Sequence, residues 1–471
     1  MIQFGTDGWR AVISDQFTFE NVRKVAQAIA DYYNQFPQET PSKTIALGYD
    51  TRFLSDQYAK CIGEILAANG FEVLFAETFV PTPSVSIQIV KKKLLTGVMV
   101  TASHNPPEYN GIKIKGSFGG PVEAQVTGQI EKLIDKNPVK QIPFEDAVTA
   151  KKIILTDFYK DHVKAITSYI NFKTFKNKKF RVLVDAMHGA SDRFIEKLFD
   201  DSPVKVTTIR SEINPSFGGF GPEPIPKHLG EMTFRMKEGA FDIGLVNDGD
   251  ADRIAAMRPD GRYISPSEII ALLTLHLVED KKWSGGVVKT VSCSVLIDRV
   301  ARRLGLKIYE TPIGFKHICK LMREQDILIG GEESGGIGVK NYIPERDGVL
   351  LALLLLEMMA DRNTGITQIM DQMEKNFGRF HYLREDIHFQ GGAEKKNEIL
   401  LSLKNNPPAD LMGRRVVEIK SSDGMKFICE DESWLLLRFS GTESLLRVYA
   451  ESDSLKFAKE LIQHGRKLAH S

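Results

Sequence analysis

The sequence predicts an α/β protein with three related α/β domains that contain mixed sheets, followed by a smaller C-terminal α+β domain. A strand–helix–strand pattern recurs three times at roughly domain-sized intervals, which is typical of α/β domains. The C-terminal part instead shows short apolar runs separated by turns and one closing helix. A chain of 471 residues suits three or four domains at ~100–200 residues each. We expect domain boundaries that give 1–150, 151–258, 259–368 and 369–471.

The first unit begins with an amphipathic helix from about Phe19, where apolar residues keep the spacing of three and four that defines one helix face. A strand over 44–49, a helix over 57–68 and a strand over 71–75 follow. The apolar run 94–100 predicts a further buried strand, because it is short, continuous and followed by turn-forming residues.

The second and third units repeat this order. Their strands and helices are expected at 181–185, 192–199, 204–209, 286–291, 294–304 and 306–309. The run 349–360 is the most apolar of the chain, but Glu357 interrupts it and it is shorter than the ~20 residues that span a bilayer. It therefore predicts a buried helix. In the last domain, four short strands and a helix over 454–468 are expected.

Composition excludes some partner classes. The chain has 62 Lys and Arg against 61 Asp and Glu, so no global field favours nucleic acid or membrane. The four cysteines are far apart and form no CxxC motif, which favours reduced thiols. The N-terminus has neither the basic nor the apolar region of a signal peptide. We expect a cytoplasmic protein, monomer or homodimer, with no nucleic-acid or membrane partner.

The stretch 101–106, Thr-Ala-Ser-His-Asn-Pro, follows the expected strand 94–100 directly. Open α/β sheets bind ligands at the carboxyl ends of their strands. Ser103 beside His104, with Lys113 shortly after, supplies a nucleophile and two candidate proton carriers. Ser, Asn and Pro also favour turns for conformational reasons. This stretch alone therefore leaves a catalytic loop and a plain turn as equal alternatives.

Asp248, Asp250 and Asp252 alternate along the chain after the apolar run 243–246. In extended backbone, alternate side chains project to one side, where three carboxylates would repel one another. This arrangement favours a hard divalent cation such as Mg²⁺. An EF-hand is excluded, because its sixth position would be Arg253 instead of Gly. A solvated acidic turn is the remaining alternative.

Two further stretches carry candidate binding residues. The loop 330–336 contains two glutamates and a serine among glycines, which suits a polyol ligand. The segment 438–444 contains an arginine, hydroxyls and a glycine, as in a phosphate nest, and Arg447 could add a second cation. Both stretches could instead be ordinary turns, and Lys316 could be a solvated lysine. The chain has no GxxxxGK[ST], GxGxxG, GxSxG or HExxH motif.

Taken together, these stretches resemble the α-D-phosphohexomutase superfamily, and most closely phosphoglucomutases within the phosphoglucomutase/phosphomannomutase family. The motifs are Ser-His-Asn-Pro at 103–106, Asp-Gly-Asp-x-Asp-Arg at 248–253, Gly-Glu-Glu-Ser-Gly at 331–335 and Arg-x-Ser-Gly-Thr at 438–442. They occur in the order of the family and, with 4–10 and 48–52, cover essentially the whole chain. The resemblance implies four domains around a central cleft.

The resemblance also implies site residues. Ser103 matches the serine that carries a phosphoryl group, and Asp248, Asp250 and Asp252 match Mg²⁺ ligands, with a phosphoserine oxygen completing the shell. The family positions that hold the sugar hydroxyls match Glu332 and Ser334. Those that hold the non-reacting phosphate match Arg438, Ser440, Gly441 and Thr442. Those that surround the transferred phosphate with positive charge match Arg10, His104, Lys113, Arg253 and Lys316.

The implied reaction is a double phosphoryl transfer, which depends on positioning and charge neutralisation. Phospho-Ser103 gives its group to one end of a hexose monophosphate, and the hexose 1,6-bisphosphate turns around. Ser103 then takes back the phosphate from the other end. In this scheme His104 is a ligand of the phosphoryl group, and Lys113 and Lys316 are the candidates for moving protons.

The substrate is expected to be a phosphosugar, with glucose preferred. Glu333 and Gly336 resemble the phosphoglucomutase form of the sugar loop, because the phosphoglucosamine and dual mannose forms tend to have histidine at position 336. Phe439 and Ser444 depart from the prolines common in the phosphate loop. A phosphomannomutase or another phosphosugar mutase, a sugar-phosphate phosphatase and a non-catalytic sensor are the alternatives.

Overall fold

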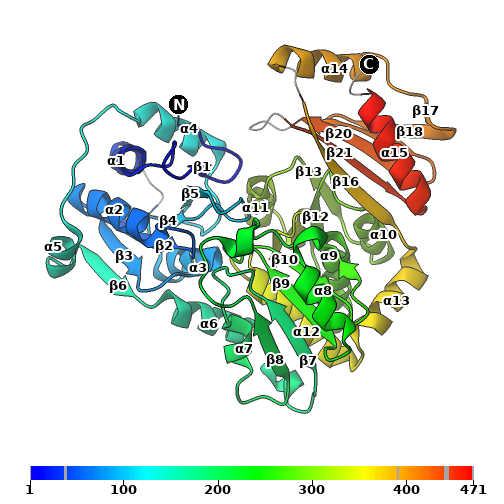
Figure 1. The fold of residues 1–471 in the computed structure, drawn as a ribbon, viewed down its shortest axis with the longest axis horizontal. Helices are drawn as coiled ribbons and strands as arrows, with labels where there is room; N and C mark the ends of the chain where they lie inside the picture. The colour runs from blue at the N-terminus through cyan, green and yellow to red at the C-terminus, as the bar shows by residue number, and fades with distance from the viewer. Residues whose placement is uncertain (1, 37–39, 390–391, 440–444, 469–471) are drawn as a thin grey trace.

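The computed structural model describes residues 2–36, 40–389, 392–439 and 445–468, and contains four β-sheets that follow one another along the chain (Figure 1). This four-domain α/β architecture confirms the expected fold class. In Figure 1 the blue N-terminal domain and the orange-to-red C-terminal domain lie on opposite sides of the green and yellow central domains. In the described ranges, no helix combines the length and the apolar character needed to cross a membrane.

The first sheet is mixed, with β2, β3, β4 and β6 parallel and β1 and β5 antiparallel to their neighbours. Its order is β1 (Trp9–Val12), β5 (Tyr109–Lys115), β4 (Thr96–Val100), β2 (Thr44–Tyr49), β3 (Glu72–Ala76) and β6 (Ile153–Thr156). The helices are α1 (Phe19–Gln35), α2 (Ser55–Ala68), α3 (Thr82–Lys92), α4 (Ala124–Leu133) and α5 (Phe144–Thr149). Because β6 pairs with β3, this sheet continues past residue 150.

The second sheet places β9 beside the parallel pair β7 and β8, and β10 runs antiparallel to β9. Its order is β11 (Tyr263–Ile264), β10 (Ile254–Met257), β9 (Ile243–Asn247), β7 (Arg181–Asp185) and β8 (Lys205–Ile209). The helical elements are α6 (Phe158–Tyr169), η1 (Phe172–Phe175), α7 (Phe194–Leu198), η2 (Phe217–Gly219), η3 (Pro226–His228) and α8 (Gly230–Lys237).

The third sheet has the order β13 (Ile308–Thr311), β12 (Gly286–Thr290), β14 (Ile327–Gly331) and β15 (Ile337–Val339). Its helices are α9 (Pro266–Leu275), the π-helix η4 (His276–Asp280), α10 (Val295–Arg303), α11 (Phe315–Glu324), α12 (Gly348–Arg362) and α13 (Ile366–Phe377). Residues Val349 to Ala360 of α12 are buried, as their apolar character predicts. They belong to one hydrophobic core that runs from the second sheet into the third.

The fourth sheet is antiparallel throughout. Its order is β16 (His381–His388), β21 (Leu445–Ser452), β20 (Trp434–Phe439), β19 (Met425–Cys429), β18 (Arg414–Lys420) and β17 (Asp410–Leu411), with helices α14 (Ala393–Asn405) and α15 (Leu455–Leu468). Trp434, Leu436 and Tyr449 pack against Val291 and Val295, which joins this domain to the third.

Candidate functional site

Ser103 lies in the turn between β4 and β5, three residues beyond the end of β4, and its side chain is buried. Its hydroxyl donates to Asp248 Oδ2 over 2.8 Å. The backbone of Ser103 has a φ of 54°, in the left-handed region that non-glycine residues rarely adopt. Strain of this kind persists where the surrounding structure imposes it, and it occurs often at functional sites. The turn is therefore built to present this hydroxyl to the aspartate loop.

The Ser103 turn is held by Arg52, which follows β2. The Arg52 guanidinium donates to four backbone carbonyl oxygens of the turn, which belong to Ser103, Asn105, Pro106 and Tyr109. Burial lowers the pKa of Arg52 to about 10, and its partner is the buried Asp50 carboxylate. Asp50 also accepts from the hydroxyl of Thr101. The turn is thus fixed from the neighbouring strand end.

Asp248, Asp250 and Asp252 lie directly after β9, and one oxygen from each carboxylate falls within 4.8 Å of the others. The expected clustering is present, but the reason inferred from the sequence is wrong. The segment is a turn and not extended backbone, and Ala251 has a φ of 56°. The carboxylates converge because the chain curls around them, so that all three are buried.

Two cations neutralise part of this charge. Lys113 Nζ contacts Asp250 Oδ2 at 2.7 Å and Asp252 Oδ2 at 2.9 Å. Arg346 Nη2 contacts Asp252 Oδ2 at 2.9 Å and Asp7 Oδ2 at 2.6 Å. Asp7 is also 3.1 Å from Lys113 Nζ, so it joins the two cations from the N-terminal loop.

The pKa values of the site follow from burial and from these charges. Burial raises the pKa of Asp248 well above its ordinary value, and the charges of Asp250 and Asp252 raise it further. Burial alone would also raise the pKa of Asp250, but the adjacent Lys113 ammonium holds it below its ordinary value. Burial would lower the pKa of Lys113, and the aspartates raise it above its ordinary value instead.

The residues fit a divalent cation. Asp250 Oδ1 and Asp252 Oδ1 are buried and have no hydrogen-bond partner among the described residues. Buried polar atoms without a partner are rare in proteins, and each of them needs an explanation. Together with Asp248 they offer carboxylate oxygens within bridging distance, which is the ligand type that Mg²⁺ prefers.

The other expected basic residues surround Ser103. Arg10 lies on β1 and donates to Asn105 Oδ1 at 2.7 Å. His104 Nδ1 is 3.5 Å from the Ser103 hydroxyl. Burial lowers the pKa of His104 well below its ordinary value, and the charges of Arg253 and Arg10 lower it further. Arg253 Nε lies 3.7 Å from Asp248 Oδ2. The imidazole is therefore a neutral group among cations.

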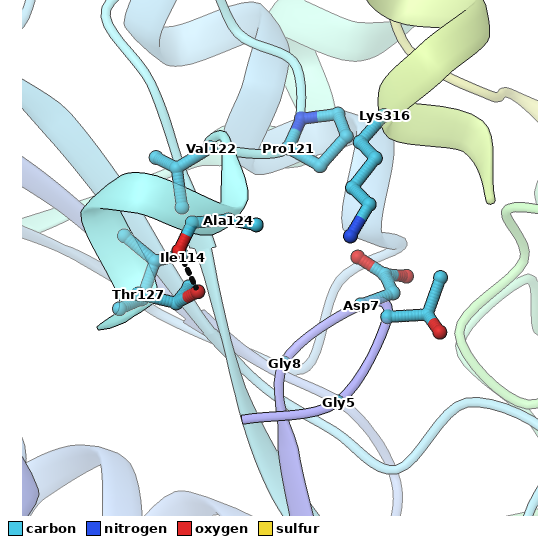
Figure 2. A pocket seen from close by; sticks show the side chains of 10 residues that line it. Gly5, Asp7, Gly8, Ile114, Pro121, Val122, Ala124, Thr127 and Lys316 are labelled. Atoms are coloured by element: carbon cyan, nitrogen blue, oxygen red, sulfur yellow. Dashed lines mark hydrogen bonds between the residues drawn. The ribbon is translucent and has the colours of Figure 1, made fainter. Parts of the chain in front are cut away.

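Lys316 is the second residue of α11, in the third domain. It lines a pocket with the N-terminal loop 5–8 and the segment around Pro121. Figure 2 shows its ammonium group pointing towards the Asp7 carboxylate. Since Asp7 contacts Lys113 and Arg346, Lys316 borders the same charged network from the third domain.

The expected sugar loop follows β14. Glu332 is buried, and its Oε1 accepts from the backbone amide of Gly314 at 2.9 Å. Burial raises the pKa of Glu332 to about 7. The neighbouring Glu333 accepts from the hydroxyl of Ser292 at 2.6 Å, and Ser334 is partly exposed. Glu332 thus contacts the residue just before α11, the helix that carries Lys316.

The expected phosphate loop is described in part. Ser440, Gly441 and Thr442 lie outside the described residues. Arg438, at the end of β20, donates to Asp423 Oδ1 at 2.9 Å. Arg447 on β21 pairs in register with Arg438, and its Nε lies 3.6 Å from Asp386 Oδ2.

Direct contacts link all four stretches. Ser103 reaches the aspartate turn at Asp248. Arg253 forms an isolated β-bridge with Gly336 of the sugar loop, and Glu332 reaches Gly314. Ile313, the residue before Gly314, donates its backbone amide to Asp423, which is the partner of Arg438. A series of contacts therefore connects the four sequence motifs from the first domain to the fourth.

Several residues of this site escaped the sequence analysis as participants. Arg346 and Thr82 contact the aspartates, and Arg52 holds the serine turn. Asp7 contacts the two cations Lys113 and Arg346. Arg52 and Asp7 lie within stretches that resemble family signatures, which is the one signal that pointed near them. For Arg346 and Thr82 no local pattern distinguishes them from ordinary helix-flanking residues.

Comparison with known proteins agrees with this geometry. Family models of phosphoglucomutase/phosphomannomutase α/β/α domains I, II and III match residues 1–140, 159–261 and 265–377, and the C-terminal domain model matches 398–464. A crystal structure described as a phosphomannomutase from Thermus thermophilus is 31% identical, with a TM-score of 0.87, and the match covers 100% of this chain and 99% of that chain.

Two curated relatives match over nearly their whole length. A phosphoglucomutase/phosphomannomutase of Thermococcus kodakarensis is 27% identical over 465 residues, covering 99% of this chain and 98% of the relative. A phosphoglucosamine/phosphogalactosamine mutase of Sulfurisphaera tokodaii is 27% identical over 470 residues, with the same coverage of 99% and 98%. The fold and the site define an enzyme of the phosphohexomutase class, that is, an isomerase. The chain belongs to the phosphoglucomutase/phosphomannomutase family.

Proposed function

We propose that the protein is a Mg²⁺-dependent phosphohexomutase that interconverts hexose 1-phosphates and hexose 6-phosphates, with glucose preferred. The observation that carries this proposal is the 2.8 Å contact between the Ser103 hydroxyl and Asp248, at the edge of a buried aspartate triplet. A serine that only shaped a turn would have no reason to donate its hydroxyl to one carboxylate of a buried triplet. The contact supports Ser103 as the phosphoryl carrier.

In the proposed reaction, the bond between Ser103 Oγ and phosphorus breaks as a sugar hydroxyl oxygen binds the phosphorus and gives up its proton. After the bisphosphate has turned around, Ser103 Oγ attacks the other phosphate, and the sugar oxygen leaves with a proton. Asp248, Asp250 and Asp252 would hold Mg²⁺, which when bound neutralises charge on the transferred group. Arg10, His104 and other basic residues of the site would contact that group.

The remaining residues would hold the sugar. Glu332 and Ser334 are proposed to bind hydroxyl groups, because they follow the strand end that faces Gly314 and α11. Arg438 and Arg447, with Ser440, Gly441 and Thr442, are proposed to bind the non-reacting phosphate. Lys113 and Lys316 are the candidates for proton transfer. Lys113 contacts Asp250 and Asp252, and the Lys316 ammonium group points towards Asp7 (Figure 2).

Replacement of Ser103 by alanine tests the proposal. With glucose 1-phosphate as substrate and glucose 1,6-bisphosphate supplied, S103A should lose at least ~10³-fold in turnover, because no other group replaces a nucleophile. The control is Ser86→Ala, which removes a buried hydroxyl from α3 without touching the aspartates. Near-normal turnover in S103A would show that another residue carries the phosphoryl group.

A phosphatase is the alternative that the same residues would serve, since water can also accept a phosphoryl group. Free phosphate released at the rate of substrate loss would favour it, whereas the mutase converts one phosphosugar into another with no net release.

The four cysteines are free and buried, which supports the proposed cytoplasmic location. A phosphosugar is the only partner that the proposal requires.

A further inference from the structure

A buried chain of three polar side chains lies behind the aspartate turn and takes no part in the proposed reaction. Ser84 Oγ on α3 is 2.8 Å from His162 Nδ1 on α6, and His162 Nε2 is 2.7 Å from Asp347 Oδ2, just before α12. All three side chains are buried. The sequence separations are 78 and 185 residues, so the three segments meet only in the folded chain.

The chain has the residue types of a hydrolytic triad but not its chemistry, because no member reaches the surface. The partners of Asp347 fix the direction of its bond with His162. Asp347 accepts from the Tyr342 hydroxyl at 2.9 Å and from the backbone amides of Val349 and Leu350, so it is an acceptor towards His162 as well. His162 Nε2–H then donates to Asp347, and His162 Nδ1 shares a hydrogen bond with the Ser84 hydroxyl. Every polar group of the chain is satisfied.

The Ser84 end of this series of three side chains is linked to Asp250 through α3. Thr82 begins α3, two residues before Ser84. Its backbone amide donates to Asp250 O at 2.9 Å, and its hydroxyl donates to Asp250 Oδ2 at 2.6 Å. The position of this carboxylate therefore depends on where the first turn of α3 lies.

The Asp347 end of this series is linked to the middle of the aspartate turn through Gly348. Gly348, next to Asp347, donates its amide to Ala251 O at 3.0 Å. A Cβ atom on Gly348 would come within 2.2 Å of Arg253 O, so the backbone of α12 is pressed against the turn. His162 thus links the N-terminal ends of α3 and α12, which contact the adjacent residues Asp250 and Ala251 of the aspartate turn.

We infer that His162 is a positioning residue for the cation site, which fixes α3 and α12 relative to each other and thereby fixes the Asp250–Asp252 turn. This inference rests on the proposed function, because it needs the triplet to bind a cation. Partners that orient metal ligands typically change metal affinity by about 10–100-fold when removed. The predicted phenotype is weaker cation binding, separate from any loss of overall stability.

The test compares direct binding of Mg²⁺ to the full-length wild type, His162→Gln and Ser84→Ala by titration calorimetry, with Mn²⁺ and electron paramagnetic resonance as a second probe. We expect the dissociation constant to rise about tenfold or more in H162Q and by a smaller factor in S84A. S84A keeps the inference falsifiable if H162Q fails to fold, since it removes one hydroxyl without altering the packing of the helices.

His276→Gln is the matched control. His276 is equally buried and lies between two carboxylates, Asp280 at 2.9 Å and Glu357 at 3.2 Å, but in η4 and not at the aspartate turn. H276Q should lower the melting temperature and leave Mg²⁺ affinity unchanged. Equal affinity in wild type, H162Q and S84A, or equal weakening in H276Q, would overturn the inference while the proposed function stands. Absence of Mg²⁺ binding by the wild type would overturn both.

Discussion

Arg52 Nη2 donates to the backbone carbonyl oxygen of Ser103 over 2.7 Å, so a buried cation fixes the backbone of the proposed nucleophile. The same guanidinium reaches three more carbonyl oxygens of the turn between 2.6 and 2.9 Å. Carbonyl oxygens in a buried turn need partners, and the planar fork of arginine supplies four at once. The left-handed backbone of Ser103 is thereby held in place.

Arg52→Lys should lower kcat by about tenfold or more with a smaller change in KM. Lysine keeps the positive charge beside Asp50, but its compact ammonium cannot make the four hydrogen bonds of the planar guanidinium. The turn would therefore position Ser103 less accurately. Steady-state kinetics on glucose 1-phosphate measure this. Arg466→Lys, at an exposed pair with Glu385, is the control. A rise in KM with kcat unchanged would place the role of Arg52 in substrate binding instead.

Asp250→Asn should abolish measurable Mg²⁺ binding and reduce turnover at least ~10²-fold, with a modest change in melting temperature. The fold tolerates the change because Lys113 keeps Asp252 and Asp7 as partners, and an amide oxygen can still accept from Thr82. Kinetics and thermal melts on the same preparation test it. Comparable losses in both would mean that the triplet is structural.

Glu332→Gln should change the pH dependence of stability. Burial raises the pKa of folded Glu332 from 4.5 to about 7, so the folded state holds this proton more tightly than the unfolded state. This stabilisation is fully present below pH 4.5 and is lost as the pH rises to about 7. At ~1.4 kcal/mol per pKa unit, it is worth about 3 kcal/mol at most.

Glutamine keeps an acceptor for Gly314 and cannot ionise, so its stability lacks this dependence. The melting temperature of E332Q relative to wild type should therefore be higher at about pH 8 than at about pH 5. A difference that stays constant between the two pH values would show that Glu332 titrates near its ordinary range in the folded protein.

Gly348→Ala should destabilise the protein by about 1–3 kcal/mol, because overpacking a buried contact forces backbone shifts. The new Cβ would lie 2.2 Å from Arg253 O and 2.4 Å from Asn247 Nδ2. The control is Gly128→Ala on α4, where a Cβ meets nothing within 4 Å and alanine should be neutral or stabilising. Denaturant unfolding measures both, and equal effects would contradict the predicted clash.

Side-by-side kinetics with glucose 1-phosphate, mannose 1-phosphate, glucosamine 1-phosphate and ribose 1-phosphate test the sugar preference. We expect the highest kcat/KM with glucose 1-phosphate, on the sequence of the loop that contains Glu333 and Gly336. The relatives named above cover glucose, mannose and glucosamine, so their names do not decide the question. A higher kcat/KM with glucosamine 1-phosphate would refute the preference and leave the mutase class intact.

Local sequence patterns were sufficient for most of the secondary structure. The three strand–helix–strand units are present as β2–α2–β3, β7–α7–β8 and β12–α10–β13, each with parallel strands. The helix over 192–199 is shorter than expected, since α7 covers Phe194–Leu198. Apolar periodicity reports which residues are buried, but helix ends depend on caps and neighbouring loops.

The sequence by itself identified the central residues of the candidate site, because Ser103 and the three aspartates belong to short motifs at strand ends. Only the tertiary structure decided what holds them. Arg346 is 339 residues from Asp7, and His162 is 185 residues from Asp347. Such pairs leave no periodic signal in the chain. They form because buried charges and polar atoms must find partners, and the packing of separate domains selects which residues those partners are.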